Sequence, residues 1–235
     1  MNTHLSRQFD SELDAIRANL TRMGGLVEEQ VRASMTAFAE GDVEIIESVI
    51  ARDAAVDEME MAIDDACTHI VARRQPTAID LRMIMAVGKS VTDLERIGDE
   101  AKKIAKTKRK LIDRGATGPI GNMIAVRHLG EQVAQMLHDV LDAFVRLDTE
   151  AAARVARQDE EIDRHFKAIF RQLLTYMMED PRTISAAIDV IFIAKSIERI
   201  GDHAKNIAED VVYIAKGRDV RHQGIEAMEQ EAKAP

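Results

Sequence analysis

Four pairs of acidic residues have the spacing and chemistry of metal ligands. The segment LERIGDEAKKIA at 94–105 recurs as IERIGDHAKNIA at 197–208, and each copy contains Glu-x-x-x-Asp. A further pair with the pattern Asp-x-x-x-Asp precedes each copy. The four pairs are Asp53 and Asp57, Glu95 and Asp99, Asp159 and Asp163, and Glu198 and Asp202.

The spacing within each pair places both carboxylates on one face of a helix, about one turn apart. Like charges at this spacing destabilise a helix unless a positive group lies nearby. If the helices of each half are antiparallel neighbours in suitable register, four carboxylates converge on one patch. Such oxygen-only sites suit Mg²⁺, Mn²⁺, Ca²⁺ or iron. A helical wheel places Glu95 and Asp99, and likewise Asp53 and Asp57, beside the apolar stripe of their helix, where solvent can reach a site.

The same pattern also has an interpretation without metal. Acidic pairs at this spacing arise by chance in so acidic a chain, so only their matched duplication is informative. Duplicated carboxylates could remain solvated and pair weakly with Arg96 and Arg199. Gly98 and Gly201, which recur within the motif, favour close helix approach over a role with a ligand.

Other residues that could form a functional site have weaker sequence support. Glu95 and Glu198 are not followed by His three positions later, which excludes the di-iron signature of helical bundles. His203 is expected at a solvated surface position, and Cys67 in the core. The basic run from Lys102 to Lys110 could dock an acidic partner, anionic lipid or phosphate, although a charged helix end is the commoner interpretation.

The hydrophobic periodicity predicts an all-α fold with two tandem, similar three-helix bundles. Six long helices are expected. The first spans about 5–38, the second follows it up to the break at 73–76, and the third spans about 77–114. The fourth includes 124–144, the fifth runs from about 149 to the break at Pro181, and the sixth spans about 183–215. Asp53 and Asp57 match Asp159 and Asp163 at an offset of 106 residues, and the offset becomes 103 after the Pro76 and Pro181 breaks. We therefore divide the chain into a first repeat at 1–116, a second repeat at 117–217 and a polar, mobile tail at 218–235.

Composition limits the classes of function and partner. The 235 residues carry a net charge of −9, which argues against binding to nucleic acid. No apolar run is long enough to span a membrane, and the sequence opens without the apolar core of a signal peptide. A single cysteine cannot form an internal disulfide and fits a reducing compartment. We expect a cytoplasmic protein.

Three segments resemble the PhoU family of bacterial phosphate-signalling proteins. They are LERIGDEAKKIA, SIERIGDHAKNIAEDVVYIAKGRDVRH and HLSRQFDSELDAI, and the resemblance extends from about Phe9 to His222. It implies two three-helix bundles whose acidic motifs hold divalent or trivalent metal ions such as Mg, Mn or Fe, on the eight carboxylates given above. Asn206 extends the second motif by one turn, whereas Lys103 at the matching position could weaken or simplify the first site.

The resemblance also implies a negative regulator of phosphate uptake and phosphate-starvation signalling, not an enzyme. Its partners would be the ATPase of the phosphate ABC transporter and a phosphate-sensing histidine kinase. The protein would then lie in the cytoplasm, or peripherally at the inner membrane through these partners, as a homo-oligomer, specifically a dimer. Two alternatives stay open, a metal-free helical adaptor and a carboxylate-metal hydrolase, although the sequence shows no nucleophile or base beside the acidic pairs.

Overall fold

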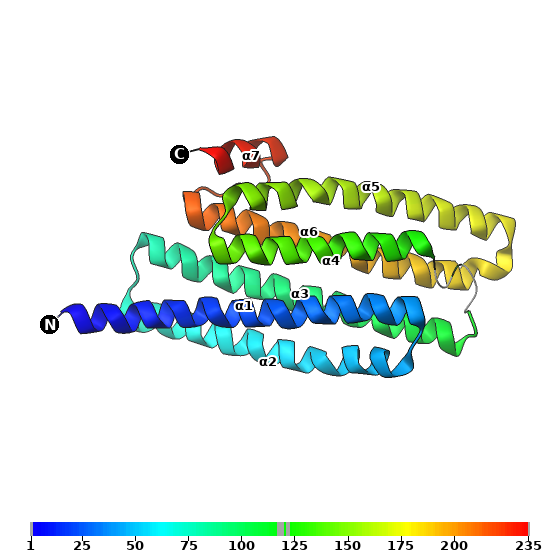
Figure 1. Ribbon diagram of the computed structural model, residues 1–235, viewed down its shortest axis with the longest axis horizontal. Coiled ribbons are helices and arrows are strands. Elements are labelled where there is room, and N and C mark those ends of the chain that lie inside the picture. Colours follow the sequence, from blue (N-terminus) through cyan, green and yellow to red (C-terminus); the bar gives the residue numbers. More distant parts are fainter. Residues whose placement is uncertain (1, 117–119, 121–122, 235) are drawn as a thin grey trace.

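The computed structural model describes residues 2–116, 120 and 123–234. Within these ranges the chain forms seven α-helices and one short 3₁₀ helix (Figure 1). The elements are α1 (Asn2–Glu40), α2 (Val43–Arg74), α3 (Ala78–Asp113), α4 (Ile124–Arg146), α5 (Thr149–Glu179), η1 (Pro181–Thr183), α6 (Ile184–Lys216) and α7 (Ile225–Lys233).

The first bundle consists of α1, α2 and α3, each antiparallel to the helix before it (Figure 1). Gly41 ends α1 with a positive φ of 70°. The Asp42 carboxylate then caps α2 by accepting hydrogen bonds from the backbone N–H groups of Glu44, at 2.8 Å, and Ile45, at 3.3 Å. A tight connection at 75–77 leads into α3, so α2 and α3 are antiparallel neighbours.

The second bundle repeats this design with α4, α5 and α6. Asp148 caps α5 as Asp42 caps α2, accepting a hydrogen bond from the Ala151 N–H at 2.9 Å. Pro181 separates α5 from α6, because proline is tolerated at the start of a helix and not in its interior. The predicted all-α architecture of two similar three-helix bundles is confirmed.

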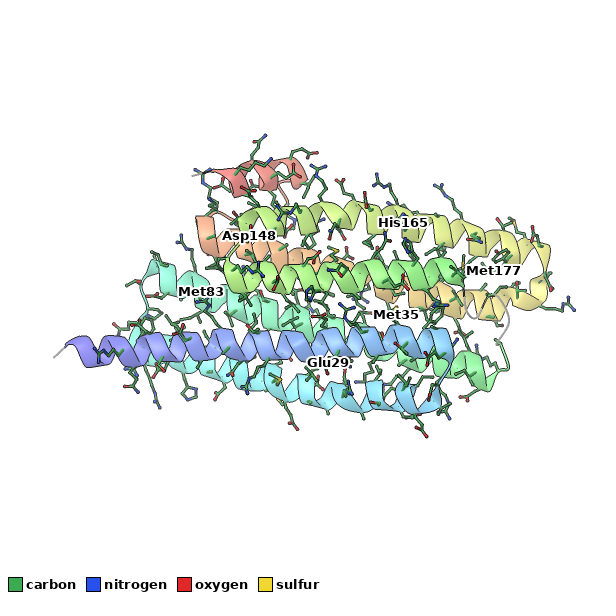
Figure 2. The ribbon with its side chains drawn as sticks, in the orientation of Figure 1. Glu29, Met35, Met83, Asp148, His165 and Met177 are labelled. Carbon is green, nitrogen blue, oxygen red and sulfur yellow. The ribbon has the colours of Figure 1, made fainter. Side chains whose placement is uncertain are left out.

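The central helices α3 and α6 lie side by side and join the two bundles into one core (Figure 1). Ile97 of α3 and Ile200 of α6 are both buried within it. Helices α1 and α4 also meet, and Met35 of α1 occupies space that a β-carbon at Gly130 of α4 would fill (Figure 2). Aliphatic side chains fill the spaces between the helices, so the core forms although only 3% of the residues are aromatic.

Two boundaries were predicted from the sequence. The division at 116/117 falls where residues 117–119 and 121–122 lie outside the described ranges. The segment at 218–235, predicted to be a polar and mobile tail, contains the helix α7. Met228 and Ala232 of α7 are buried, and the Thr149 hydroxyl of α5 donates a hydrogen bond to the Ala232 carbonyl at 2.8 Å.

None of the described helices combines the length and the apolar character that a bilayer span requires.

Candidate functional site

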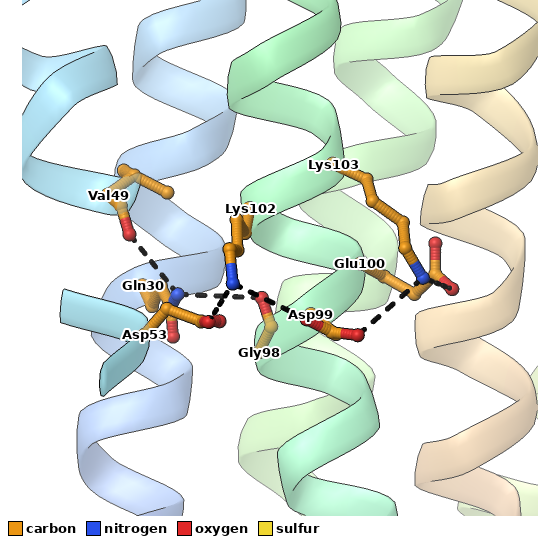
Figure 3. Close-up of polar contacts among 8 residues, drawn as sticks. All are labelled: Gln30, Val49, Asp53, Gly98, Asp99, Glu100, Lys102 and Lys103. Carbon is orange, nitrogen blue, oxygen red and sulfur yellow. Dashed lines mark hydrogen bonds and ion pairs between the residues drawn. The ribbon is translucent and has the colours of Figure 1, made fainter. Parts of the chain in front are cut away.

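The first acidic site lies between α2 and α3, where the predicted pairs come together. Asp53 is buried with 3% of its surface exposed, whereas Asp99 is half-buried and Asp57 is exposed. The Lys102 ammonium group donates a hydrogen bond to Asp53 Oδ2 and lies 3.8 Å from Asp99 Oδ1 (Figure 3). A lysine from the same motif therefore lies between carboxylates from the two helices.

Glu95 lies close enough to the other carboxylates of this site to feel their charge. Burial raises the pKa of Glu95, and the charges of four neighbouring carboxylates raise it further. These neighbours, in order of effect, are Glu60, Asp99, Asp57 and Asp53. Glu60 was not among the ligands predicted from the sequence. Its position three residues after Asp57, on the same helix face, was the signal that could have identified it.

Gly98 allows α3 to pack closely against α1 and α2. A β-carbon at Gly98 would lie 3.2 Å from Gln30 Oε1 and 3.4 Å from Val56 Cγ1. Gln30 is fully buried, and its side-chain amide donates to the carbonyls of Val49, at 3.3 Å, and Gly98, at 3.4 Å (Figure 3). Close helix approach is thus confirmed as the reason for this glycine.

The second acidic site lies between α5 and α6 at the equivalent position. Asp159 and Glu198 are buried, Asp163 is half-buried and Asp202 is exposed. Lys205 donates to Asp159 Oδ2 at 3.0 Å, just as Lys102 contacts Asp53 in the first site. The other oxygen, Asp159 Oδ1, is buried and has no hydrogen-bond partner. An unpaired buried carboxylate oxygen is costly, so this atom is a candidate ligand for a cation.

The charge environment of the second site disfavours the ionised form of Asp202. Partial withdrawal from water among the packed helices, followed by the negative charges of Glu198 and Asp159, raises the pKa of Asp202 to about 6. Lys195 opposes this shift, and the charge of Asp163 adds to it. The four predicted ligands of this half are therefore near enough to influence one another.

Asp202→Asn is expected to raise the melting temperature of the metal-free protein at neutral pH but not near pH 4. The folded chain holds the Asp202 proton up to about pH 6, whereas the unfolded chain releases it near pH 4. The carboxyl group's contribution to folding is thus complete at low pH and is lost as pH rises through this interval. Circular dichroism melts in chelator check this, and equal shifts at both pH values would contradict it.

As the side chains lie, no cluster of three or more His, Cys, Asp or Glu side chains in the described part of the chain is arranged to hold an ion. Lys102 and Lys205 supply the positive charge beside Asp53 and Asp159 instead. Oxygen ligands from two helices, one of them unpaired at Asp159, nevertheless suit a hard cation. An ion would replace the lysine as the positive group.

His203 does not lie at the solvated surface position expected from the sequence. It is buried, and its Nδ1 lies 2.7 Å from Asp93 Oδ1 across the α3–α6 interface. Asn206 donates to the same Asp93 oxygen at 3.1 Å. The repeat counterpart of His203, Glu100, is also buried at this interface and pairs with Arg199 at 2.9 Å. These residues join the two bundles.

Much of the basic run in α3 is engaged within the fold. Lys102 contacts Asp53, and Lys103 lies 3.1 Å from Glu100. Lys108 is buried with its ammonium group 4.9 Å from the centre of the Phe38 ring. These lysine side chains are engaged within the fold, so their positions do not support the docking of a partner through this run. Cys67 is buried, as predicted for a packing residue.

A comparison with protein families identifies the family to which both bundles belong. The family model described as the PhoU domain matches residues 20–107 and 126–211, which include all eight predicted carboxylates. The chain belongs to the PhoU family. Each match covers most of one bundle, so the duplication seen in the acidic motifs is a duplication of the PhoU domain.

Individual PhoU proteins match along nearly their whole length. A phosphate-specific transport system accessory protein PhoU homolog from Pseudomonas putida is 50% identical over 230 residues, covering 98% of this chain and 89% of that protein. The phosphate-specific transport system accessory protein PhoU from Escherichia coli (strain K12) is 46% identical, with 95% and 92% covered.

Two crystal structures of PhoU proteins share the fold. PhoU from Pseudomonas aeruginosa aligns with a TM-score of 0.86 and 46% identity over 89% of this chain and all of that one. The phosphate transport system regulatory protein PhoU from Streptococcus pneumoniae aligns with a TM-score of 0.82 and 29% identity, with 90% and 99% covered.

Proposed function

We propose that this chain is an accessory protein of a phosphate-specific transport system and acts by contact with partner proteins. The observation that carries this proposal is membership of the PhoU family through both bundles, with relatives of that name matching 98% of the chain. The finer proposal is negative regulation. Under abundant phosphate the protein would link the transporter's ATPase to a phosphate-sensing histidine kinase and limit both uptake and the starvation response.

We further propose that both acidic sites bind metal ions such as Mg²⁺, Mn²⁺ or iron. Asp53, Asp57, Glu95 and Asp99 would hold the first ion or ions, and the equivalent carboxylates Asp159, Asp163, Glu198 and Asp202 the second. The bound ion would reverse the charge of an acidic surface and offer coordination positions to a partner. The unpaired oxygen of Asp159 and the raised pKa values of Glu95 and Asp202 support this, because a bound cation would stabilise the ionised form of these carboxylates.

A metal-free adaptor is the second candidate, and a specific observation favours it. Lys102 and Lys205 already provide positive charge to Asp53 and Asp159 at matching positions in the two bundles. The acidic surfaces could then act through their residual charge alone. A carboxylate-metal hydrolase would require a nucleophile activated by a positioned base, and the family relationship favours an accessory protein instead.

Capture of the transporter ATPase from cells grown at low and high phosphate tests the contact proposal. We expect wild type to capture it in a phosphate-dependent way and an Asp99→Ala, Asp202→Ala double variant to lose that dependence. The variant should fold, because Asp99 is half-buried and Asp202 exposed.

A matched control removes exposed carboxylates outside both sites. Asp65→Ala with Asp142→Ala also takes one acid from each bundle, and both side chains are exposed, by 73% and 54%. This control should behave as wild type. Unchanged capture by the double variant at both phosphate levels would leave the acidic sites without a role in partner binding.

A further inference from the structure

A polar cavity lies between α3 and α6, at the end of the molecule where the chain leaves α6 for α7 (Figure 1). Its volume is about 610 Å³, and small-molecule sites usually measure about 300–1,000 Å³. Its walls come from α3, from residues 202–210 of α6 and from residues 221–228. Segments far apart in the sequence thus border a space large enough for a small metabolite.

Each of these three segments contributes a cationic side chain to the cavity. The cationic residues are Lys89, Arg96, Lys205 and Arg221. Two of them are fixed by carboxylates. Lys205 donates to Asp159 Oδ2 at 3.0 Å. Arg221 donates through Nε to Asp219 Oδ1 at 2.9 Å, which holds this guanidinium group at the cavity wall.

The other two cations, Lys89 and Arg96, form no ion pair within the described part of the chain. The Lys89 ammonium group lies 5.2 Å from the centre of the Tyr213 ring. The position equivalent to Lys89 in the second bundle is Phe192, so the repeated fold does not require a cation there. Lys89 and Arg96 lie on one face of α3, two turns apart, and their long side chains can therefore reach a ligand between them.

The duplication indicates why Arg96 has no acidic partner. Its equivalent at the offset of 103 residues, Arg199, pairs with Glu100 at 2.9 Å. The equivalent of Glu100 is His203, which is not an acid. With 41 acidic and 32 basic residues in the chain, an unpaired arginine is not a consequence of composition. Arg96 is therefore available to an anion from outside the chain.

The acidic side chains of the cavity carry less negative charge than their number indicates. They are Asp93, Asp202, Glu209 and Asp210. Burial is the largest cause of raised pKa values in three of them, to about 6 for Asp202 and about 7 for Asp210, with a smaller rise for Glu209. The fourth, Asp93, accepts a hydrogen bond from Asn206 at 3.1 Å. These groups are thus partly protonated or already hydrogen-bonded at neutral pH.

We propose that this cavity binds a phosphate monoester of a small polar molecule, with the phosphoryl group held by Lys89, Arg96 and Arg221. A guanidinium group donates two parallel hydrogen bonds to phosphoryl oxygens, and an ammonium group adds a point charge. A carboxylate carries a single charge that one arginine can balance, whereas a phosphoryl dianion suits several cations.

The size and the remaining walls of the cavity favour an ester over free phosphate. A lone oxyanion would leave most of the 610 Å³ unfilled. Ile225 and the buried Met228 supply an apolar wall for the body of the ligand. Asn206 and the carboxyl groups of Asp93 and Asp210 can exchange hydrogen bonds with its hydroxyl groups.

Isothermal titration calorimetry with four probes tests the proposal. They are glucose 6-phosphate, adenosine 5′-monophosphate, orthophosphate and glucose. The protein is stripped of metal and dialysed free of chelator, so the result does not depend on an ion at the acidic sites. We expect at least one ester to bind about 10-fold or more tightly than orthophosphate, because its body adds contacts, and we expect glucose not to bind.

Variants connect the binding to the two cations without ion pairs. Arg96→Gln and Lys89→Met should each weaken ester binding by about 10- to 100-fold, the usual effect of losing a hydrogen bond between charged groups. Arg146→Gln is the matched control, since it removes one positive charge from a side chain on α4 that is 70% exposed and outside the cavity. This control should bind as wild type.

A fluorescence measurement locates the ligand. The chain has two tyrosines and no tryptophan, so Tyr213 is the sole reporter in Tyr176→Phe protein. Glucose 6-phosphate should draw Lys89 away from the Tyr213 ring and change its emission. The midpoint of this change should match the affinity from calorimetry.

Several results would overturn the proposal. They are the absence of binding by both esters at millimolar concentration, orthophosphate binding as tight as that of the esters, and wild-type affinity in folded Arg96→Gln and Lys89→Met proteins. Equal loss of affinity in Arg146→Gln, or unchanged Tyr213 emission at saturating ester, would place the ligand elsewhere. Circular dichroism would establish that each variant remains helical.

Discussion

Asp159→Asn is expected to weaken Mn²⁺ binding at the second acidic site by on the order of 100-fold or more. Asp159 has one oxygen paired with Lys205 and one buried oxygen without a partner, which makes it the carboxylate best placed to become a ligand. Asparagine keeps the volume but removes the charge. Even residues that only support a ligand typically contribute 10- to 100-fold to metal affinity, so loss of a direct ligand should cost at least as much. Isothermal titration calorimetry checks the affinity.

Two further variants make the prediction specific. Lys205→Met should tighten Mn²⁺ binding, since it removes the positive charge that competes with the ion and preserves most of the side-chain volume. Asp142→Asn, an exposed carboxylate of α4 outside both sites, should bind as wild type. Equal affinities for wild type and Asp159→Asn, or weaker binding by Lys205→Met, would contradict the assignment.

Ile97→Ala is expected to destabilise the whole protein by about 2–5 kcal/mol, the usual range for deleting a fully buried isoleucine side chain. Ile97 has no exposed surface and lies on α3, where the two bundles meet. Because α3 and α6 share one core, we expect the variant and wild type each to unfold in a single transition. Denaturant unfolding monitored by circular dichroism measures both the loss and the cooperativity.

Ile79→Ala on the same helix is the control for this prediction. Ile79 is 68% exposed, so the change in the free energy of unfolding should stay within about 0.5 kcal/mol. Two separated transitions in wild type would show that the bundles unfold independently. Similar losses in the two alanine variants would show that Ile97 is less tightly packed than its burial indicates.

The fold could be predicted from the sequence to a large extent because the helix signals are local. Apolar spacings of three and four residues identified all six long helices, and Asp42 caps α2 where the sequence placed a break. Helix α7 was missed because it is short and buries only Met228 and Ala232, too few residues to establish a period. It packs against α5, a contact between segments far apart in the chain that local sequence does not reveal.

The acidic sites were predicted in part. The four pairs were identified through their duplication, and the structure brings members of both pairs together in each bundle. The role of Lys102 could not be foreseen, since its partner Asp53 lies 49 residues away and their contact depends on the register of α2 and α3. His203 was misplaced for the same reason, because its partner Asp93 belongs to the other bundle. Contacts between segments that are far apart in the sequence can be predicted only when the fold is known.

The central claim is that the clustered carboxylates of both bundles bind metal ions, and counting the bound metal tests it most directly. Chelator-free protein is loaded with Mn²⁺ at neutral pH, desalted and analysed for its elements, alongside Asp53→Asn, Asp159→Asn and the variant with both changes. We predict at least one ion at each site in wild type, loss of one site's metal in each single variant and no bound metal in the double variant. Wild type that retains no more metal than the double variant would contradict the account and leave the lysines as the counter-ions of both sites.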